Sequence, residues 1–269
     1  MKEQVNIVEF CSIASGSSGN CIFVGTSEAN ILIDAGISAK KISEGLKGID
    51  IDPADIDGIF ITHEHIDHIQ GIQVFAKKYG VDIYGTKKTL RALSSKYNND
   101  FGDCRFIDIN PDIDICLKDA IIHPFAVSHD ALDPVGYRIE SEDKRFAVAT
   151  DLGFFDDYII ENLKNLDGIC IEANHDINML MVGKYPYNLK QRVAGPKGHL
   201  SNDSCADLLC RIFCERLKHI LLIHLSKENN YAELAFETVR AELLTRCPHH
   251  ELSLDVAGRN TPSDIFSIL

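Results

Sequence analysis

The chain has 269 residues, of which 45% are hydrophobic and 25% are charged, and a formal net charge of −13 at pH 7. A chain of this length and composition can bury a large core, so we expect one domain over residues 1–269. The acidic balance argues against a protein that coats nucleic acid through a general basic field, and any contact with phosphates must be local.

Short apolar runs alternate with amphipathic segments along the chain. The pattern predicts strands near residues 5–13, 21–25, 30–34, 58–62, 81–84, 120–127, 134–140, 144–149, 167–172 and 219–223. It predicts helices near residues 38–47, 70–79, 86–97, 155–164, 202–216 and 230–244. Many early strands follow one another without a helix between them, which argues against a purely parallel doubly wound sheet. Two mixed β-sheets that face each other, with helices outside, accommodate this α/β order.

The cysteines and the N-terminal segment indicate the compartment. The nine cysteines include no C-x-x-C pair, as expected of reduced thiols in a cytoplasmic protein rather than of a disulfide framework. Residues 1–8 lack the apolar core of a secretion signal, and no apolar run approaches membrane-spanning length. We therefore expect a cytoplasmic protein with no membrane partner.

The most informative stretch is His63-Glu64-His65-Ile66-Asp67-His68, which follows the apolar residues 58–61. A strand that ends there projects His63 and His65 to one side, because alternate residues of a strand share a face. The loop after the strand then brings Asp67 and His68 from a second direction. One metal rarely takes four ligands from so short a segment, so the spacing suggests two neighbouring metals. The alternative is a loop that is rich in histidine by chance, and its unpaired imidazoles would be costly to bury.

Further candidate ligands each follow an apolar run: His129 after residues 121–128, Asp151 after residues 146–150 and His224 after residues 220–223. Asp34 ends a similar run, for which a turn at the end of a strand is the alternative role. The remaining histidines, of which His175 could line the same pocket, are expected to be structural or exposed: His123, His175, His219, His249 and His250.

Asp34, the H-x-H-x-D-H segment, His129, Asp151 and His224 resemble the five ordered motifs of the metallo-β-lactamase superfamily. Residues 15–20 (SGSSGN), 198–202 (GHLSN) and 224–230 (HLSKENN) are similar to the YycJ (WalJ) branch, whose members resemble ribonuclease Z and are regarded as bacterial exonucleases. The resemblance implies an αβ/βα sandwich, two mixed β-sheets flanked by helices, with metals at one edge between the sheets.

This resemblance and the ligand types imply that His63, His65 and His129 hold one metal, that Asp67, His68 and His224 hold the other, and that Asp151 bridges them. Two divalent ions about 3.5–4 Å apart lower the pKa of a shared water and clamp a phosphoryl group. Asp67 would also orient that water or accept its proton, and Asp34 would position the ligands. Ligands without sulfur suit zinc and tolerate manganese or iron. Flavodiiron relatives carry glutamate where this chain has His65, so hydrolysis is expected rather than redox chemistry.

Residues 177–202, the basic island, contain no acidic residue in a protein that has 40 of them. The island carries Lys184, Lys190, Arg192 and Lys197 together with Tyr185 and Tyr187. We interpret it as a substrate groove for nucleic acid; the alternative is a solvated loop whose lysines offset acidic neighbours. The loop of residues 15–20 could likewise be an anion-binding nest or a simple turn.

The island ends at His199, followed by Ser201 or Asn202 as the N-cap of a helix. A helix start offers free N–H groups and the positive end of a dipole, so Ser201 and Asn202 are predicted to bind substrate phosphate. The resemblance to ribonuclease Z implies that His199 contacts the scissile phosphate or protonates the leaving oxygen.

These features predict a binuclear metal-dependent phosphodiesterase that hydrolyses nucleic acid. The resemblance to the YycJ branch implies a 5′–3′ exonuclease that acts on DNA rather than RNA. The alternative enzyme is a small-molecule hydrolase that opens a thioester, lactone or β-lactam, which would need no basic groove. A non-catalytic binding module is a third alternative, disfavoured by the presence of all seven ligand-type residues.

Overall fold

The structure is a computed structural model that describes residues 7–247 and 251–269. Its contacts divide the chain into two compact units, which we describe in turn. The first comprises residues up to 126, residues 131–145 and the C-terminal segment from residue 258; the second comprises residues 127–130 and 146–257. The hydrogen-bonded strand orders are β14-β1-β2-β3-β4-β5-β6 in one sheet and β13-β12-β11-β10-β9-β8-β7 in the other.

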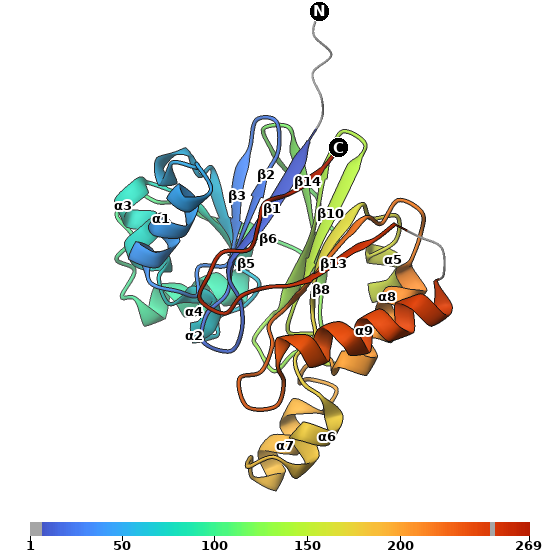
Figure 1. The fold of residues 1–269 in the computed structure, drawn as a ribbon. Coiled ribbons are helices and arrows are strands. Elements are labelled where there is room, and N and C mark those ends of the chain that lie inside the picture. Colours follow the sequence, from blue (N-terminus) through green and yellow to red (C-terminus); the bar gives the residue numbers. More distant parts are fainter. Residues whose placement is uncertain (1–6, 248–250) are drawn as a thin grey trace, which may run out of the picture. The chain divides into compact units, whose positions relative to one another are not determined.

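The first sheet lies wholly within the first unit. Its strands are β1 (Val8–Ala14), β2 (Cys21–Gly25), β3 (Asn30–Ile33), β4 (Gly58–Phe60), β5 (Ile83–Thr86), β6 (Phe106–Ile109) and β14 (Phe266–Ile268). Strands β14, β1, β2 and β3 pair antiparallel, whereas β3 to β6 pair parallel. The sheet is therefore mixed, and β14, from the far end of the sequence, lies beside β1 (Figure 1).

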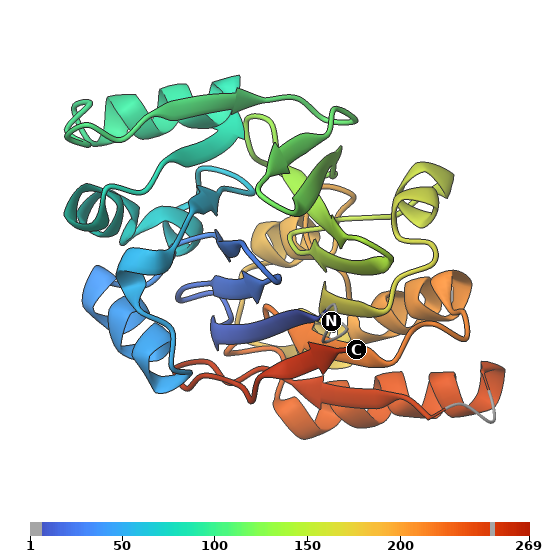
Figure 2. The same cartoon turned by 90° about the horizontal axis from the view of Figure 1, so that it is seen from above.

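Helices cover one face of this sheet (Figures 1 and 2). They are α1 (Ala39–Gly48), α2 (Ile66–Ile69), α3 (Ile72–Tyr79) and α4 (Lys87–Lys96), with a 3₁₀ turn at Pro53–Asp55. Their apolar faces pack on the strands in one core cluster that includes Leu32, Ile59, Ile83, Leu46 and Phe75. Burial of apolar surface at roughly 25 cal/mol per Å² is what fixes these helices on the sheet.

The register of the parallel strands positions the chemistry of the first unit. Ile33 of β3 lies opposite Phe60 of β4, so the two strands end at the same edge. The N–H of Asp34 donates to the carbonyl oxygen of Phe60 at 2.9 Å. The residues that follow β3 and β4, which include Asp34 and the histidine motif, therefore lie together.

The first unit also holds the antiparallel strands β7 (Ile115–Leu117), β8 (Ala120–Ala126) and β9 (Val135–Ser141). The second unit holds parallel strands, namely β10 (Lys144–Ala149, within this unit from Phe146), β11 (Gly168–Glu172), β12 (His219–Ile223) and β13 (Ser253–Val256). Its helices are α5 (Asp157–Asn162), α6 (Ile177–Val182), α7 (Tyr187–Val193), α8 (Asn202–Ile212) and α9 (Ala232–Arg246). Ala149 pairs with Ile171, and Glu172 with Ile223, so β10, β11 and β12 also end at a common edge.

The predicted fold class of two mixed β-sheets flanked by helices is confirmed, and each of the ten predicted strands corresponds to an observed one. Residues 5 and 6 of the first predicted strand lie outside the described residues. Four strands were missed, β6, β7, β13 and β14, because each is only three or four residues long and mostly incompletely buried. Helices α2 (Ile66–Ile69), α6 and α7 were also missed, and the basic island is helical at α6 and α7 rather than a loop. Searched over its described residues, the chain has no helix with the length and hydropathy of a membrane span. The prediction of one domain stays a prediction.

Candidate metal centre

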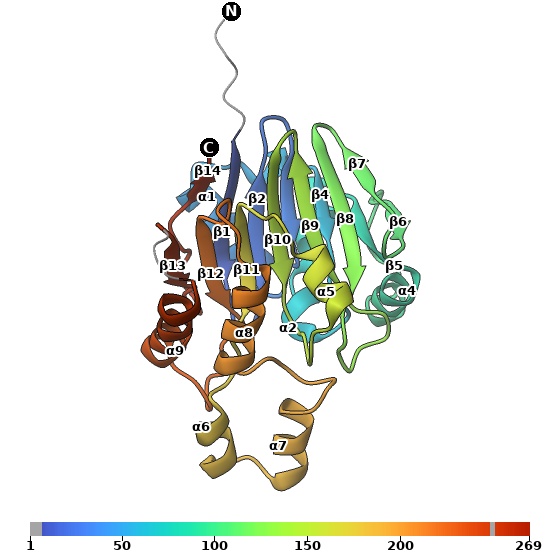
Figure 3. The ribbon, with the colours of Figure 1, turned by 90° about the vertical axis from the view of Figure 1, so that its right-hand side faces the viewer.

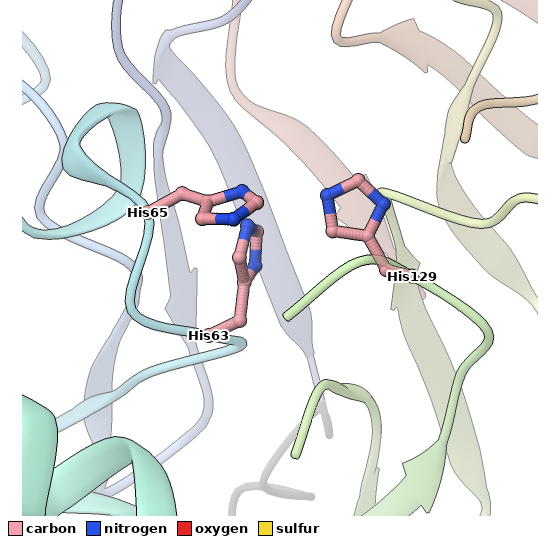
Figure 4. A group of neighbouring side chains, drawn as sticks. All are labelled: His63, His65 and His129. Carbon is pink, nitrogen blue, oxygen red and sulfur yellow. The ribbon is translucent and has the colours of Figure 1, made fainter. Parts of the chain in front are cut away.

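The histidine motif of the first unit follows β4 directly. His63 and His65 lie on the segment that joins β4 to α2, with their ring centroids 4.5 Å apart (Figure 4). His65 is the N-cap of α2, so Asp67 and His68 are in a short helix and not in the loop that we expected. His68 also stacks near His63, with ring centroids 4.1 Å apart, and both of these side chains are fully buried. The motif therefore concentrates imidazoles at one end of the parallel strands.

Asp34 forms hydrogen bonds with the histidine motif and with the residue before it. Its backbone is left-handed, with a φ of 63°, which directs the buried carboxylate to the end of β4. One carboxylate oxygen accepts the N–H of Thr62 at 2.8 Å, and the other accepts the Thr62 hydroxyl at 2.8 Å and Nδ1 of His68 at 2.7 Å. A carboxylate that accepts from Nδ1 fixes the tautomer of His68 and leaves Nε2 as the ligand atom. This is the arrangement that a positioning role for Asp34 requires.

The loop of residues 15–20 packs against the same motif. The N–H of Asn20 donates to the carbonyl oxygen of Asp67 at 2.8 Å, and its side-chain nitrogen lies 3.2 Å from Nε2 of His68. The N–H of Gly16 donates to the side chain of Asn20 and that of Gly19 to the carbonyl of Gly16. These three N–H groups are used within the protein, and their contacts make the loop a support for α2.

The second unit carries a separate donor group at the ends of its parallel strands. Asp151, Glu172, His199 and His224 each offer one ligand atom, and these atoms all lie within 4.8 Å of one another. Asp151 and His224 both have left-handed backbone, with φ values of 55° and 57°. Such a conformation costs about 1–3 kcal/mol for a residue other than glycine and is concentrated at functional sites.

Glu172 is the centre of this group and was missed as a site residue. Its Oε2 accepts the N–H of Asp151 at 2.8 Å and lies 3.0 Å from Nδ1 of His224 and 3.1 Å from Nδ1 of His199. Its Oε1 accepts the N–H of Leu200 at 2.6 Å. Burial raises the pKa of Glu172, but the charge of His199 and the imidazole hydrogen bonds outweigh it and lower the pKa to about 2. The sequence signal that could have identified Glu172 is an ionisable residue at the end of an apolar run, which the structure shows as a fully buried strand.

His129 lies on the loop between β8 and β9, within the second unit (Figure 4). Its Nδ1 lies 3.0 Å from the carbonyl oxygen of Gly198, to which it donates, so that Nε2 carries the lone pair that could bind a metal. Nε2 is 3.5 Å from a carboxylate oxygen of Asp151 and 3.3 Å from one of Asp130. Burial lowers the pKa of His129, more than the nearby carboxylates raise it. The imidazole is thus held in the neutral form that binds metals.

His199 keeps a partly exposed side chain, at 20%, beside the buried carboxylates. Its burial lowers the pKa, but the charge and hydrogen bond of Glu172 and the charge of Asp151 raise it above the ordinary value. His199 therefore combines a raised pKa with partial access to solvent. By contrast, burial lowers the pKa of His175 to about 4, and His175 is in no donor group among the described residues. His249 and His250 lie outside the described residues.

The predicted substrate residues fall into two sets. Ser201 is the N-cap of α8, and its hydroxyl accepts the N–H of Ser204 at 3.1 Å. Asn202 is fully buried, its side chain pairs with that of Asn230, and its N–H donates to the carbonyl oxygen of His175. These contacts use the backbone N–H and one side-chain N–H of Asn202 inside the protein, and its burial disfavours a contact with a phosphate.

The basic residues of the island are all on α6, α7 or the segments next to them. Arg192 forms an ion pair with Asp130, and Nζ of Lys190 donates to the carbonyl oxygen of Met181 at 2.6 Å. Within the described part of the chain, Lys184 and Lys197 form no ion pair.

The ligand-type residues of each unit fit divalent metals by their chemistry. They are buried or half-buried imidazoles and carboxylates, without thiolates, and suit zinc as well as manganese or iron. In His68, His129 and His224 the Nδ1 atom already faces a carboxylate or a carbonyl oxygen. Imidazoles that bind metals through Nε2 characteristically have such a partner for the other nitrogen.

Comparison with known proteins places the chain in a family. Residues 29–225 match the model of the β-lactamase superfamily domain. The chain is 43% identical over 236 residues, 87% of this chain and 88% of the other, to exodeoxyribonuclease WalJ of Streptococcus pneumoniae serotype 2. It is 37% identical over 228 residues, 85% of this chain and 86% of the other, to exodeoxyribonuclease YycJ of Bacillus anthracis.

The fold is also similar to that of a solved structure with much lower sequence identity. The metallo-β-lactamase fold protein YhfI of Bacillus subtilis aligns with a TM-score of 0.71 at 16% identity, over 97% of this chain and 99% of the other. At that identity the comparison bears on the fold alone. With the family model matched over most of its length and relatives of this similarity, the chain belongs to the metallo-β-lactamase superfamily.

Proposed function

We propose that the protein is a metal-dependent phosphodiesterase that hydrolyses nucleic acid and acts as a 5′–3′ DNA exonuclease. The observation that carries this proposal is the 43% identity, over nearly the whole of both chains, to a protein named exodeoxyribonuclease. The same name is printed for the relative from Bacillus anthracis, which favours DNA over RNA as the substrate. The donor groups supply the ligand types that metal-assisted hydrolysis needs.

The finer proposal is that two divalent ions are bound per chain, zinc first and manganese or iron as alternatives. His63, His65 and His129 would hold one ion, Asp67, His68 and His224 the other, and Asp151 would bridge them. When bound, such ions supply an activated water and neutralise charge on the leaving oxygen. The preset tautomers of His68, His129 and His224 support these assignments, because each leaves Nε2 as the donor atom.

The residues of the chain itself then move protons. Asp67, with its side chain 21% exposed, is the acceptor for the proton of the attacking water. His199 carries the proton that the leaving oxygen needs, since Glu172 holds its Nδ1 and raises its pKa. Glu172 and Asp34 do not meet substrate in this scheme, and they position the imidazoles instead.

Substrate phosphates would be held by the basic island and by Ser201 at the start of α8. Lys184 and Lys197 carry the greater part of this role, because Lys190 and Arg192 already have partners within the protein. We expect Arg192 to contribute least, since its guanidinium is paired with Asp130. The nine cysteines, all of which are free thiols, fit a cytoplasmic location.

The test is a hydrolysis panel. The purified protein, supplied with zinc, manganese or iron, is incubated with 5′- and 3′-labelled DNA and RNA, single- and double-stranded, and with a thioester and a β-lactam. We expect metal-dependent release of nucleotides from the 5′ end of DNA and no release by the Asp151→Ala variant. Turnover of the thioester or β-lactam alone would favour a small-molecule hydrolase, and binding without hydrolysis of any substrate would favour a non-catalytic module.

A further inference from the structure

Helices α6 and α7 stand apart from the rest of the second unit. Figures 1 and 3 show them as a pair that projects beyond α8, α9 and the strands β11 and β12. Helix α6 buries only Leu180, and α7 buries none of its seven residues. Helices this short are not stable in water by themselves. Because α7 buries none of its residues, packing against the core does not stabilise it, and other contacts must do so.

Polar contacts hold the pair in shape. Nζ of Lys190 on α7 donates to the carbonyl oxygen of Met181 near the end of α6, at 2.6 Å. The side-chain amide of Gln191 donates to the hydroxyl of Tyr187 at 2.8 Å, one helical turn away. The second contact fixes the position of the Tyr187 ring while its face stays open. A rigid aromatic ring loses little conformational entropy when a ligand stacks on it.

Large apolar side chains are exposed on this pair. Val182 is 86% exposed, Tyr187 72% and Met181 58%. Single exposed apolar residues are ordinary, but several together on two short neighbouring helices mark an interaction site. The apolar residues lie within residues 177–202, which have no acidic member, and they alternate with Lys184 and Lys190.

The charge and the aromatic ring together select the partner. A partner that suits lysines without carboxylates carries negative charge, and one that suits an open Tyr187 face offers flat apolar surfaces. Single-stranded nucleic acid has both features, since its bases are unpaired and its phosphates follow at each step. A duplex also carries phosphates, but the faces of its bases are covered by stacking and cannot meet the Tyr187 ring.

We infer that α6 and α7 form a platform for unpaired nucleotides, on which Tyr187 stacks against a base, Val182 and Met181 pack beside it, and Lys184 and Lys197 meet the phosphates. The inference rests on the proposed function and names the form of the substrate, a single strand or a frayed end.

The platform continues directly into the segment that supports His129. After α7, the carbonyl oxygen of Pro196 accepts the hydroxyl of Ser128 at 2.8 Å, and that of Lys197 accepts the N–H of Asp130 at 3.1 Å. The carbonyl oxygen of Gly198 then accepts Nδ1 of His129. A strand bound on the platform is therefore held by the same stretch of chain that orients a predicted metal ligand.

The absence of tryptophan from the sequence gives a direct test. In the Tyr187→Trp variant the new indole is the one tryptophan of the chain, and a stacked base quenches its fluorescence. The matched control is Tyr158→Trp on α5, which is 36% exposed in the same unit. The probe is a nuclease-resistant phosphorothioate oligo(dT), with a blunt duplex of the same length for comparison.

We expect the single strand to quench the tryptophan at 187 and not that at 158, and the blunt duplex to quench neither. In Tyr187→Ala the Kd for the single strand should rise by about 5-fold to 100-fold, because stacking on one aromatic ring carries binding of that order. Equal quenching at 187 and 158, or an unchanged Kd in Tyr187→Ala, would overturn the platform.

Two further measurements distinguish a failure of this inference from a failure of the proposed function. With Tyr187→Ala, the loss of hydrolysis should be much larger on single-stranded DNA than on bis(p-nitrophenyl) phosphate, while Tyr158→Ala changes neither. If the wild-type enzyme degrades DNA but Tyr187→Ala loses equally on both substrates, the platform is wrong and the proposed function stands. If Tyr187→Ala instead abolishes self-association in sedimentation and leaves the binding of DNA intact, the surface belongs to a second copy of the chain and the inference is overturned.

Discussion

The carboxylate of Asp34 accepts the proton of Nδ1 of His68 across 2.7 Å, and both side chains are almost entirely buried. The contact crosses 34 residues of sequence and joins the residue that follows β3 to α2, the helix that follows the paired strand β4. Because the carboxylate fixes the tautomer, the lone pair of His68 is on Nε2. In this structure the side-chain nitrogen of Asn20 lies 3.2 Å from that atom, so a metal would replace the amide there.

Asp34→Asn should therefore lower metal affinity or turnover by roughly 10- to 100-fold. Asparagine tolerates the left-handed backbone at this position, so the substitution removes the charge and one acceptor without the strain that alanine would add. The control is Asp50→Asn, an exposed aspartate with a similar φ of 59°. Metal content and the hydrolysis of labelled DNA are measured together, and wild-type values for both in Asp34→Asn would remove Asp34 from the account.

Glu172→Gln should be damaging although it leaves size nearly unchanged. The carboxylate receives four donors, from Asp151, His199, Leu200 and His224, and an amide presents N–H groups to at least one of them. We expect roughly 10- to 100-fold loss of activity, with Glu215→Gln at an exposed position as the control. Normal turnover in Glu172→Gln would show that the imidazoles keep their orientation without it.

His199→Ala should separate proton transfer from metal binding. If His199 gives its proton to the leaving oxygen, turnover of DNA falls on the order of 10²- to 10⁴-fold at unchanged metal content. A diester with a p-nitrophenolate leaving group needs little protonation, so its hydrolysis should fall far less. Loss of metal in this variant would make His199 a ligand, as its place in the donor group allows, and equal losses on both substrates would contradict the role of general acid.

His175 should make the stability of the protein depend on pH. Burial lowers its pKa in the folded state to about 4 from an ordinary 6.5, so the unfolded chain binds a proton that the folded one rejects between these values. The contribution of this pKa difference to the free energy of unfolding is constant above pH 6.5 and falls as the pH drops towards 4. It amounts to at most about 3 kcal/mol. Urea unfolding of metal-depleted protein at pH 7.5 and pH 5 measures it.

In His175→Leu the difference in free energy of unfolding between pH 7.5 and pH 5 should shrink relative to the wild type, whatever the variant does to stability itself. The comparison of differences cancels the other titrating groups, which both proteins share. An identical pH dependence in the two proteins would mean that His175 is protonated in the folded state as readily as in the unfolded one.

Much of the fold could be predicted because long, buried strands have an unmistakable pattern. Strands such as β2 and β11 are buried at every residue and read as continuous apolar runs. Short strands do not, and β14, with three residues of which one is buried, is held by its pairing with β1 across the length of the chain. Such a pairing is a tertiary event that local sequence does not encode.

The residues of the candidate site also divide into those that the sequence predicts and those that it does not. Strand-end residues such as Asp34 and Asp151 were identified because an ionisable group after an apolar run stands out. Glu172 also ends an apolar run but was missed, because its role depends on imidazoles 27 and 52 residues away in sequence. The burial of Asn202 was not predictable either, because its partner Asn230 turns an apparent surface position at a helix start into a buried one.

The most direct test of the account is the number of metal ions that activity requires. Metal-depleted protein is titrated with zinc or manganese, and hydrolysis of 5′-labelled DNA is followed beside elemental analysis of the same samples. The proposed binuclear centre, with Asp151 as the shared ligand, predicts that activity rises until two ions are bound per chain and then stops. It also predicts that Asp151→Ala loses activity more severely than any single histidine variant. Full activity with one ion per chain, and no gain from a second, would contradict the binuclear centre.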